Sequence, residues 1–265
     1  EFRQEAERLR RKIMSAWAEL DRLIVGMHEA KESFFIALAA GGHIVLEGAP
    51  GLAKTKLFEA AAQVCGLRVG WIQGGPNLSP DDMIGQYMED DTANSDDGRI
   101  RRGMLSFFPG PLFNQMVFCD EINRNTPKTQ SALLGAMEKW FVITPYGDKI
   151  SVPNPFIVVA TQNPHEISEG TFPLTAANID RFMLSQVFGY PSREEELKIV
   201  AQDDREPLVS DLPAILDAED IRRLREVVKE LLPRDRYPRT TEYVVRLVRA
   251  TRPGDDVDIN IVLPG

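Results

Sequence analysis

The chain of 265 residues is acidic, because 31 lysines and arginines stand against 40 aspartates and glutamates and give a formal net charge of -9. This charge opposes non-specific attraction to nucleic-acid phosphates or anionic lipid, so no stable nucleic-acid partner is expected. Its cysteines, Cys65 and Cys119, lie in apolar stretches, which argues against a disulfide framework or a zinc site and favours a reducing cytoplasm. The longest apolar stretch, residues 34–46, is too short for a transmembrane helix.

The amino-terminal segment, residues 1–24, predicts an amphipathic helix. Its apolar residues recur at helical spacing on one face: Leu9, Ile13, Trp17, Leu20 and Ile24. Such stripes usually pack on their own domain, and we expect that here rather than the docking of a partner. A second helix is expected near residues 29–40.

Short apolar runs alternate with helical stretches or loops along the next part of the chain. The runs occupy residues 43–47, 67–73, 116–119, 156–160 and 182–187. Strands that alternate with helices are typical of a three-layer α/β fold built on a parallel sheet. Two turn signals, Asp97-Gly98 and Tyr146-Gly147-Asp148, predict hairpins inserted into this body.

After residue 190 the pattern changes to helices only. Ser192 and Glu195 match a capping box at the start of one helix, and two more helices are expected at residues 217–232 and 240–250. We therefore predict an α/β domain at residues 1–190, which includes the amino-terminal helix, and a smaller helical domain at residues 191–265.

A glycine-bearing loop follows the first predicted strand and leads into a helix. This is nearly the P-loop pattern, in which backbone N–H groups and the positive end of a helix dipole face phosphates. The alternative is a glycine-rich turn with an incidental lysine, which does not require strand, loop and helix in this order. The candidate nucleotide-binding residues of this segment are Gly48, Ala49, Pro50, Gly51, Leu52, Ala53, Lys54, Thr55 and Lys56.

Within this loop, two side chains have expected roles in binding a nucleotide. Lys54 is expected to reach the β and γ phosphates, and the Thr55 hydroxyl is expected to coordinate magnesium. Ala53 replaces the glycine that normally precedes this lysine, so the backbone at this position must tolerate a Cβ atom.

The strand expected at residues 116–119 runs into two adjacent carboxylates, Asp120 and Glu121. A buried strand does not carry two charges at its end without a reason. Asp120 is placed to hold magnesium through water, and Glu121 is placed to polarise the attacking water. A solvated pair of charges is the alternative, which the P-loop upstream disfavours.

Three further residues are candidates for the reaction centre. Asn163 follows the strand expected at residues 156–160, at the carboxyl edge of the sheet where ligands bind, although Asn-Pro is also an ordinary turn signal. Arg181 precedes the last strand and is a candidate arginine finger for the γ-phosphate of a neighbouring subunit. Arg124, just after the carboxylate pair, is a second candidate. For either arginine the alternative is a salt bridge to a carboxylate.

Together these motifs resemble the MoxR-type AAA+ ATPases. The resemblance rests on an ordered series of segments: residues 41–43, 51–55, 120–124, 127–134, 160–164, 170–174 and 180–182. It covers residues 24–190 strongly and the remainder loosely, and the ordered series is more specific than any single motif. In this family an alanine before the P-loop lysine is usual.

The resemblance implies a P-loop core with strand order 5-1-4-3-2, an α-helical lid after residue 190, and a hexameric ring that binds ATP with Mg²⁺ and hydrolyses it. It also implies Asn163 as sensor 1, Arg181 as the finger that acts across the subunit interface, and Val25 and Gly26 beside adenine. The two hairpins are similar to insertions that face the pore or the substrate. The lid is expected to be incomplete, because the sensor 2 arginine of this family would follow the last residue.

Members of the family are typically chaperone-like, and they mature or activate a partner protein, often one with a von Willebrand factor A domain. Two other functions remain as alternatives. One is a nucleotide-gated assembly scaffold with slow hydrolysis, which has no need of a base at Glu121 or a finger at Arg181. The other is an AAA+ motor that acts on nucleic acid, which the acidic charge disfavours.

Overall fold

The structure is a computed structural model, and it describes residues 2–48, 51–89, 100–102, 105–163, 170–201, 208–231 and 238–250. The chain forms two compact units, Glu1–Arg225 and Glu226–Gly265. Within the second unit the described part includes α9 (Pro238–Ala250). In the described part of the chain, no helix is both long enough and apolar enough to cross a bilayer.

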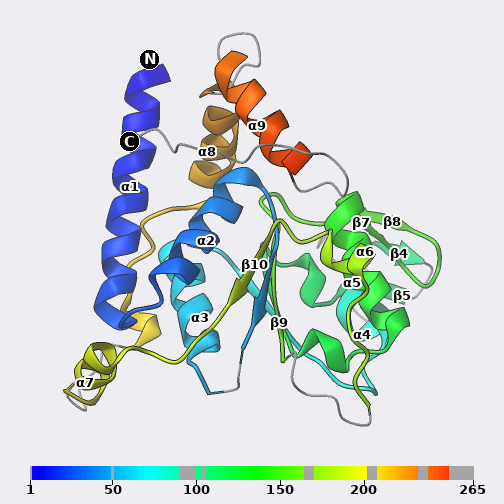
Figure 1. The fold of residues 1–265 in the computed structure, drawn as a ribbon. Coiled ribbons are helices and arrows are strands. Elements are labelled where there is room, and N and C mark those ends of the chain that lie inside the picture. Colours follow the sequence, from blue (N-terminus) through cyan, green and yellow to red (C-terminus); the bar gives the residue numbers. More distant parts are fainter. Residues whose placement is uncertain are drawn as a thin grey trace. The chain divides into compact units, whose positions relative to one another are not determined.

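The first unit is built on a five-stranded parallel sheet (Figure 1). The strands lie side by side in the order β10 (Leu184–Val187), β1 (Ile44–Glu47), β9 (Ile157–Gln162), β6 (Met116–Asp120) and β2 (Val69–Gln73). Each of these strands coincides with one of the five predicted apolar runs. The predicted three-layer α/β fold and the strand order 5-1-4-3-2 are therefore confirmed.

Helices cover both faces of this sheet, which explains why its inner strands are apolar along their whole length. On one side lie α1 (Phe2–Leu23), α2 (His28–Ala40) and α3 (Lys54–Val64), and on the other lie α4 (Pro80–Ile84) and α5 (Pro127–Lys139) (Figure 1). Successive residues of a strand point to opposite faces. Ile44 and Leu46 accordingly belong to the core shared with α1–α3, while Val45 belongs to the core shared with α4 and α5.

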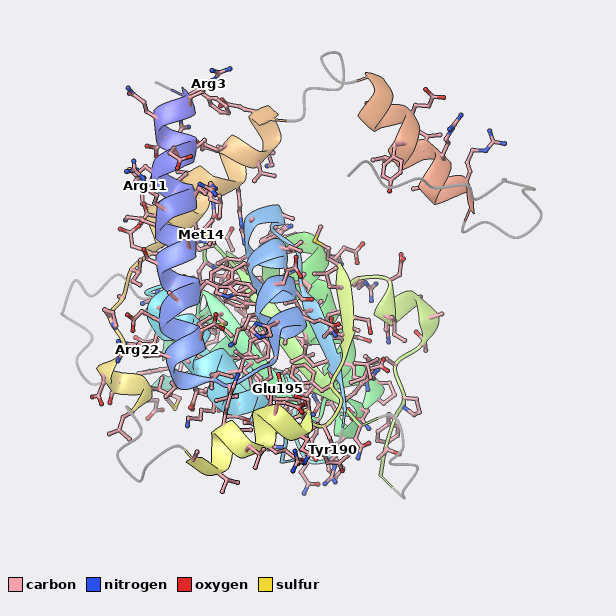
Figure 2. All side chains as sticks on the ribbon, turned by 60° about the vertical axis from the view of Figure 1, so that its left-hand side comes forward. Arg3, Arg11, Met14, Arg22, Tyr190 and Glu195 are labelled. Carbon is pink, nitrogen blue, oxygen red and sulfur yellow. The ribbon has the colours of Figure 1, made fainter. Side chains whose placement is uncertain are left out.

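The amino-terminal helix α1 packs on its own domain, as predicted. Leu9, Ala16, Leu20 and Leu23 of this helix are buried, and Trp17 stacks on Phe35 of α2 with 5.8 Å between the ring centroids. Its opposite face is exposed and carries these labelled residues: Arg3, Arg11, Met14 and Arg22 (Figure 2).

A second contact of α1 is made by a carboxylate near the start of α8 (Ala218–Leu231). Asp220 is 4% exposed and accepts a 2.9 Å hydrogen bond from Arg8 and a 2.5 Å hydrogen bond from Lys12. The segment before α8 also packs on the first unit, because the N–H groups of Ile215 and Leu216 both donate to the carbonyl of Val64, at the end of α3. Residues 208–225 thus belong to the first compact unit.

Two small antiparallel sheets are inserted between the main strands. The first has the order β3 (Gly85–Glu89), β5 (Leu105–Pro109), β4 (Arg101–Arg102), and the predicted turn at Asp97-Gly98 lies outside the described residues. The second is the hairpin of β7 (Phe141–Ile143) and β8 (Lys149–Ser151), which turns at Gly147 with φ 86° as predicted. The hydroxyl of Tyr87 on β3 donates a hydrogen bond to Asp148 beside β8, so the two insertions are in contact.

The remaining elements are short or follow β10. They are η1 (Pro111–Phe113), η2 (Ile122–Arg124), α6 (Ala176–Ile179), α7 (Arg193–Ala201) and η3 (Val209–Asp211). At the start of α7 the predicted capping box is present: the N–H of Ser192 donates to Glu195 over 2.7 Å, and the N–H of Glu195 donates to Ser192 Oγ over 3.3 Å. The domain boundary at residues 190 and 191 remains a prediction.

Candidate functional site

The site is assembled at one edge of the main sheet, where the parallel strands β1, β6 and β9 all end. Because parallel strands end on the same side, the residues that follow them meet there. The loop after β1 returns at this edge into α3, which begins at Lys54. Ala49 and Pro50 of this loop lie outside the described residues.

Two residues of the loop have left-handed backbone conformations just before the helix. Gly51 has φ 82°, and Ala53 has φ 52° and ψ 22°. This turn brings the chain into the first turn of α3, whose N–H groups and dipole favour an anion. A Cβ atom in the left-handed region costs about 1–2 kcal/mol, so Ala53 is a strained position.

The side chain of Lys54 folds back over the loop. Its Nζ donates a 2.9 Å hydrogen bond to the carbonyl oxygen of Gly48. Partial burial lowers the pKa of Lys54, while the nearby carboxylates of Asp120 and Glu121 oppose that shift. The ammonium group therefore lies between the loop and the carboxylate pair, where a bound anion would meet it.

Asp120 and Glu121 are held by a threonine that the sequence did not single out as functional. The hydroxyl of Thr161, on β9, donates to Asp120 Oδ1 and accepts a 2.9 Å hydrogen bond from the N–H of Glu121. Thr161 is 2% exposed, so this bridge between β6 and β9 is shielded from water. Its position at the end of a strand beside β6 is the signal that indicates its role.

The carboxylate of Glu121 turns away from the line of its strand, because this residue has φ 52° in the left-handed region. Its Oε2 accepts a 3.0 Å hydrogen bond from Gln73 Nε2, at the end of β2, and lies 3.4 Å from Nε of Arg124. Gln73 was not predicted from the sequence as a site residue. For Arg124, the predicted alternative of a salt bridge is present, and the partner is Glu121.

Asn163 and Arg181 lie at opposite edges of the sheet. Asn163 directly follows β9, beside the other strand ends, and the preceding Gln162 is tied to Glu47 of β1 by a 2.8 Å hydrogen bond. Arg181 comes before β10, at the edge where the strands begin, and its Nε forms a 3.1 Å salt bridge with Glu138 of α5, so the predicted alternative is present for this arginine as well. The structure thus places Asn163 with the P-loop but not Arg181.

Thr55 and Asp120 provide oxygen atoms of the type that Mg²⁺ prefers. Thr55 is exposed in the first turn of α3, one residue after Lys54, and Asp120 ends β6 near the same lysine. Mg²⁺ in phosphate sites usually takes one or two protein oxygens, with phosphates and water completing its shell. This pair therefore suits a magnesium nucleotide. Among the described residues, no group of three or more His, Cys, Asp or Glu side chains forms a separate metal cluster.

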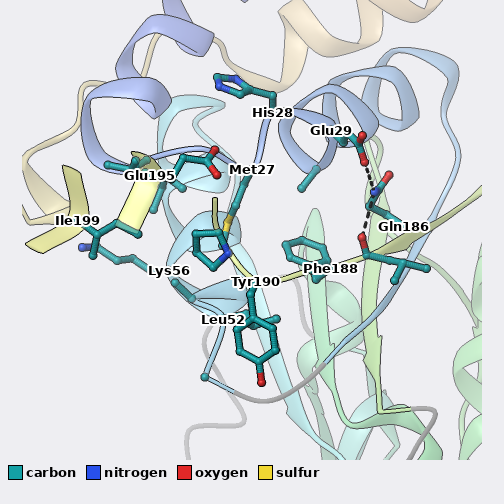
Figure 3. Close-up of a pocket in the computed structure, with 18 of the residues that line it drawn as sticks. Met27, His28, Glu29, Leu52, Lys56, Gln186, Phe188, Tyr190, Glu195 and Ile199 are labelled. Carbon is teal, nitrogen blue, oxygen red and sulfur yellow. Dashed lines mark hydrogen bonds between the residues drawn. The ribbon is translucent and has the colours of Figure 1, made fainter. Parts of the chain in front are cut away.

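A cavity of about 760 Å³ begins at the P-loop and continues between α1, α2 and α7 (Figure 3). Its lining includes Gly51, Leu52, Ala53 and Lys56 from the loop and α3. The apolar part of its wall includes Ile24, Val25, Met27, Phe188 and Ile199. Its volume is that of a small-molecule site, and its apolar wall beside Lys56 suits a ligand with an apolar part and an anionic part.

Gly26 lies in the turn that forms one wall of this cavity, with φ 71°. This left-handed conformation favours glycine, and a Cβ atom built there would come within 2.2 Å of a carboxylate oxygen of Glu195, whose side chain would have to move. Figures 2 and 3 show Glu195 on α7 facing this turn. Of the two residues predicted to lie beside adenine, Val25 lines the cavity, while Gly26 is next to it in the turn and is not among the lining residues.

Comparisons with known proteins agree with this geometry. The model of the ATPase family associated with various cellular activities (AAA) matches residues 43–184. Chaperone MoxR1 of Mycobacterium tuberculosis is 37% identical over 92% of this chain and 60% of its own length. Protein MoxR of Methylorubrum extorquens is 30% identical over 93% of this chain and 70% of its own length.

Two further relatives extend the comparison. The uncharacterized protein YeaC of Bacillus subtilis is 35% identical over 91% of this chain and 71% of its own length. A crystal structure of a candidate ATPase from Cytophaga hutchinsonii superposes with a TM-score of 0.73 and 33% identity, covering 84% of this chain and 64% of that one. The chain thus spans between 60% and 71% of the length of these proteins. From its motifs, its fold and these relatives, the chain belongs to the MoxR family of AAA+ ATPases.

Proposed function

We propose that this chain binds ATP with Mg²⁺ at the edge where β1, β6 and β9 end, and hydrolyses it. The observation that carries the proposal is the position of Lys54, whose ammonium group lies between the P-loop carbonyl of Gly48 and the carboxylates of Asp120 and Glu121, beside the cavity. A magnesium nucleotide matches all of these groups, because its phosphates suit the lysine, its metal ion suits the carboxylates and its base suits the apolar cavity. The preference for ATP over GTP rests on membership of the family.

In this proposal each residue at the edge has one task. Lys54 and the N–H groups of the loop bind the β and γ phosphates, while Lys56 at the cavity wall adds positive charge. Thr55 and Asp120 hold Mg²⁺, which when bound supplies positive charge to the phosphates. Glu121 accepts a proton from the attacking water, and Asn163 positions that water or the γ-phosphate.

Binding is tested by replacing the lysine. We expect Lys54→Ala to weaken the binding of magnesium ATP about 10- to 100-fold, because an ammonium–phosphate contact contributes about 1.5–3 kcal/mol. Lys139→Ala is the matched control, since Lys139 is exposed at the end of α5. Isothermal titration calorimetry measures both variants, and equal affinities for Lys54→Ala and the unchanged chain would contradict the proposal.

Hydrolysis is tested separately at the proposed base. We expect Glu121→Gln to bind ATP but to lower turnover at least about 100-fold, as is typical when a general base is lost. Glu32→Gln, at an exposed position of α2, is the control. Phosphate release at saturating ATP measures the effect. If Glu121→Gln turns over as fast as the control, Glu121 is not the base.

We further propose that the chain works in a ring, with Arg181 as an arginine finger for the neighbouring subunit. Arg181 lies at the edge of the sheet opposite the P-loop, so it is badly placed for a nucleotide on its own chain. Rings of six are expected from the family. Mixing Arg181→Ala subunits with Glu121→Gln subunits tests this. At some interfaces of a mixed ring, an intact Glu121 from one variant meets an intact Arg181 from the other, and turnover is expected to return there. Mixtures as inactive as the separate variants would exclude the finger.

The task of the ring is proposed to be chaperone-like remodelling or activation of a partner protein in the cytoplasm. Support comes from the family and from a relative that is named a chaperone. A partner with a von Willebrand factor A domain is the kind we would look for first. Cross-linking in cytoplasmic extract with the Glu121→Gln chain, which would hold ATP without turnover, tests this.

The division into a core at residues 1–190 and a lid at 191–265 is part of the same proposal, and limited proteolysis with and without ATP tests it.

A further inference from the structure

A buried lysine lies next to the cavity without lining it. Lys31, on α2, is 0% exposed and is one of the largest fully buried side chains of the described structure. Its Nζ donates a 2.6 Å hydrogen bond to Asp21 Oδ1 and a 2.7 Å hydrogen bond to the carbonyl oxygen of Ile24. Its backbone N–H donates over 3.0 Å to the carbonyl oxygen of Met27.

These contacts enclose the turn between α1 and α2. The turn consists of residues 24–27, and Ile24, Val25 and Met27 line the cavity. The side chain of Lys31 therefore fixes the Ile24 end of a four-residue wall, and the ordinary backbone bond of the first turn of α2 fixes the Met27 end. Because the lysine itself is absent from the lining, it acts on a ligand only through this wall.

The wall needs support because its backbone is strained. Met27 has φ 55° and ψ 33°, a left-handed conformation that costs about 1–2 kcal/mol for a residue with a side chain. Such conformations persist where surrounding contacts enforce them, and they concentrate at binding sites. Gly26, with φ 71°, is also left-handed, but glycine adopts this conformation without steric cost.

The chemistry of this support is unusual for a purely structural contact. An ammonium group buried without compensation is strongly unfavourable, and well-packed apolar residues often replace a buried ion pair without loss of stability. A charge here has the advantage of directing two short hydrogen bonds to fixed atoms, one of them a carbonyl of the wall. Asp21, whose side chain is 39% exposed, neutralises the charge from the last turn of α1.

We infer that Lys31 is a positioning residue that holds the turn 24–27 in the shape that receives the base of the nucleotide. The inference rests on the proposed function, because it takes the cavity as the site of the base and the P-loop as the site of the phosphates. Lys31 then contributes to the affinity for a nucleotide but not to the affinity for a triphosphate without a base.

The test compares magnesium ATP with inorganic tripolyphosphate as ligands, by calorimetry on the full chain. We expect Lys31→Met, which keeps the length and removes the charge, to weaken ATP binding about tenfold, which corresponds to about 1.4 kcal/mol. Tripolyphosphate binding is expected to stay within twofold of the unchanged chain. A purely structural role would lower the temperature of unfolding and leave the ratio of the two affinities unchanged.

Lys12→Met is the matched control. Lys12 also joins α1 to the body of the unit through a buried carboxylate, Asp220, but it does not line the cavity or contact the turn 24–27. Its loss is expected to lower the unfolding temperature while the ratio of ATP affinity to tripolyphosphate affinity stays constant. A ratio that changes equally in Lys12→Met and Lys31→Met would overturn the inference.

A second variant keeps the test decisive if Lys31→Met does not fold. Asp21→Asn removes the negative partner at a partly exposed position, and we expect it to lower the affinity ratio about threefold. An unchanged ratio in this variant, or in a folded Lys31→Met, overturns the inference while ATP binding stands. If the unchanged chain binds neither ligand, the proposed function itself fails. If the unchanged chain binds ATP and tripolyphosphate equally well, the phosphate site stands, but the turn 24–27 does not bind the base and the inference is refuted.

Discussion

Gln73, at the end of β2, donates a 3.0 Å hydrogen bond from its Nε2 to Oε2 of Glu121. The same oxygen lies 3.4 Å from Nε of Arg124. A carboxylate that removes a proton from water must direct a lone pair at that water. In this structure one oxygen of the proposed base is therefore engaged by its neighbours rather than directed at a substrate.

The first prediction follows from this contact. Replacing Gln73 with alanine frees a lone pair of Glu121, and we expect kcat for ATP to rise about fivefold with KM little changed, as befits the loss of one hydrogen bond of about 1 kcal/mol. Gln115→Ala is the control, because Gln115 precedes β6 at the opposite edge of the sheet. A fall in kcat would instead mean that Gln73 holds the carboxylate in its working orientation.

A second prediction concerns His43, which is buried where β1 begins. The N–H of Val158 donates to its Nδ1 over 3.0 Å, so Nε2 carries the proton and points to the carbonyl oxygen of Met137 at 3.3 Å. The pKa of His43 is lowered from 6.5 to about 4, mainly by burial. The hydrogen bond to Met137 raises this pKa, and the positive charge of Arg225 lowers it further. The folded chain thus favours the neutral ring.

The sign of the pH dependence follows from that difference. Between about pH 4 and pH 6.5 the unfolded chain binds the proton and the folded chain does not, so the contribution of His43 is complete above pH 6.5 and is lost as the pH falls towards 4. At pH 5 we expect a loss of about 2 kcal/mol. Urea unfolding of the chain and of His43→Gln, at pH 7.5 and pH 5, measures it. A stability difference between the two proteins that is equal at both pH values would contradict the assignment.

A third prediction uses the strained residue before Lys54. Ala53 has φ 52°, and glycine adopts this conformation without steric cost. Ala53→Gly should therefore raise the free energy of unfolding by up to about 1 kcal/mol, measured by urea denaturation without nucleotide. Ala60→Gly, within α3, is the comparison and should lower stability, since φ there is helical. If both substitutions destabilise the chain, the left-handed conformation at Ala53 is wrong.

A fourth prediction addresses the two inserted sheets. The hydroxyl of Tyr87 donates to Asp148, and its ring meets that of Tyr146 with 4.9 Å between the centroids. Tyr87→Phe keeps the ring and removes the hydrogen bond to a carboxylate, which contributes about 1.5–3 kcal/mol. Backbone hydrogen exchange is expected to become at least about tenfold faster in both β5 and β8. The exchange rate in β6 is expected to stay unchanged. Faster exchange in only one of the two sheets would show that they are not joined through this residue.

Much of the site could be predicted from local patterns. Lys54 follows a strand and a glycine-bearing loop, and Asp120 follows another strand, so the rule that parallel strands end at one edge already places them together. The same rule places Asn163. It applies equally to Gln73 and Thr161, which were missed because glutamine and threonine at a strand end are common and have no distinctive spacing.

The sequence by itself determined the five main strands, their order through the family resemblance, and the start of α7 at its capping box, because these depend on periodicity and on neighbours close in the chain. Only the tertiary structure decided that Gln73 engages Glu121, that Lys31 supports the cavity wall, and that Arg181 lies at the opposite edge beside Glu138. These contacts join residues on different elements, or a side chain to a distant turn. Their geometry depends on how helices and strands pack, which a one-dimensional pattern does not specify.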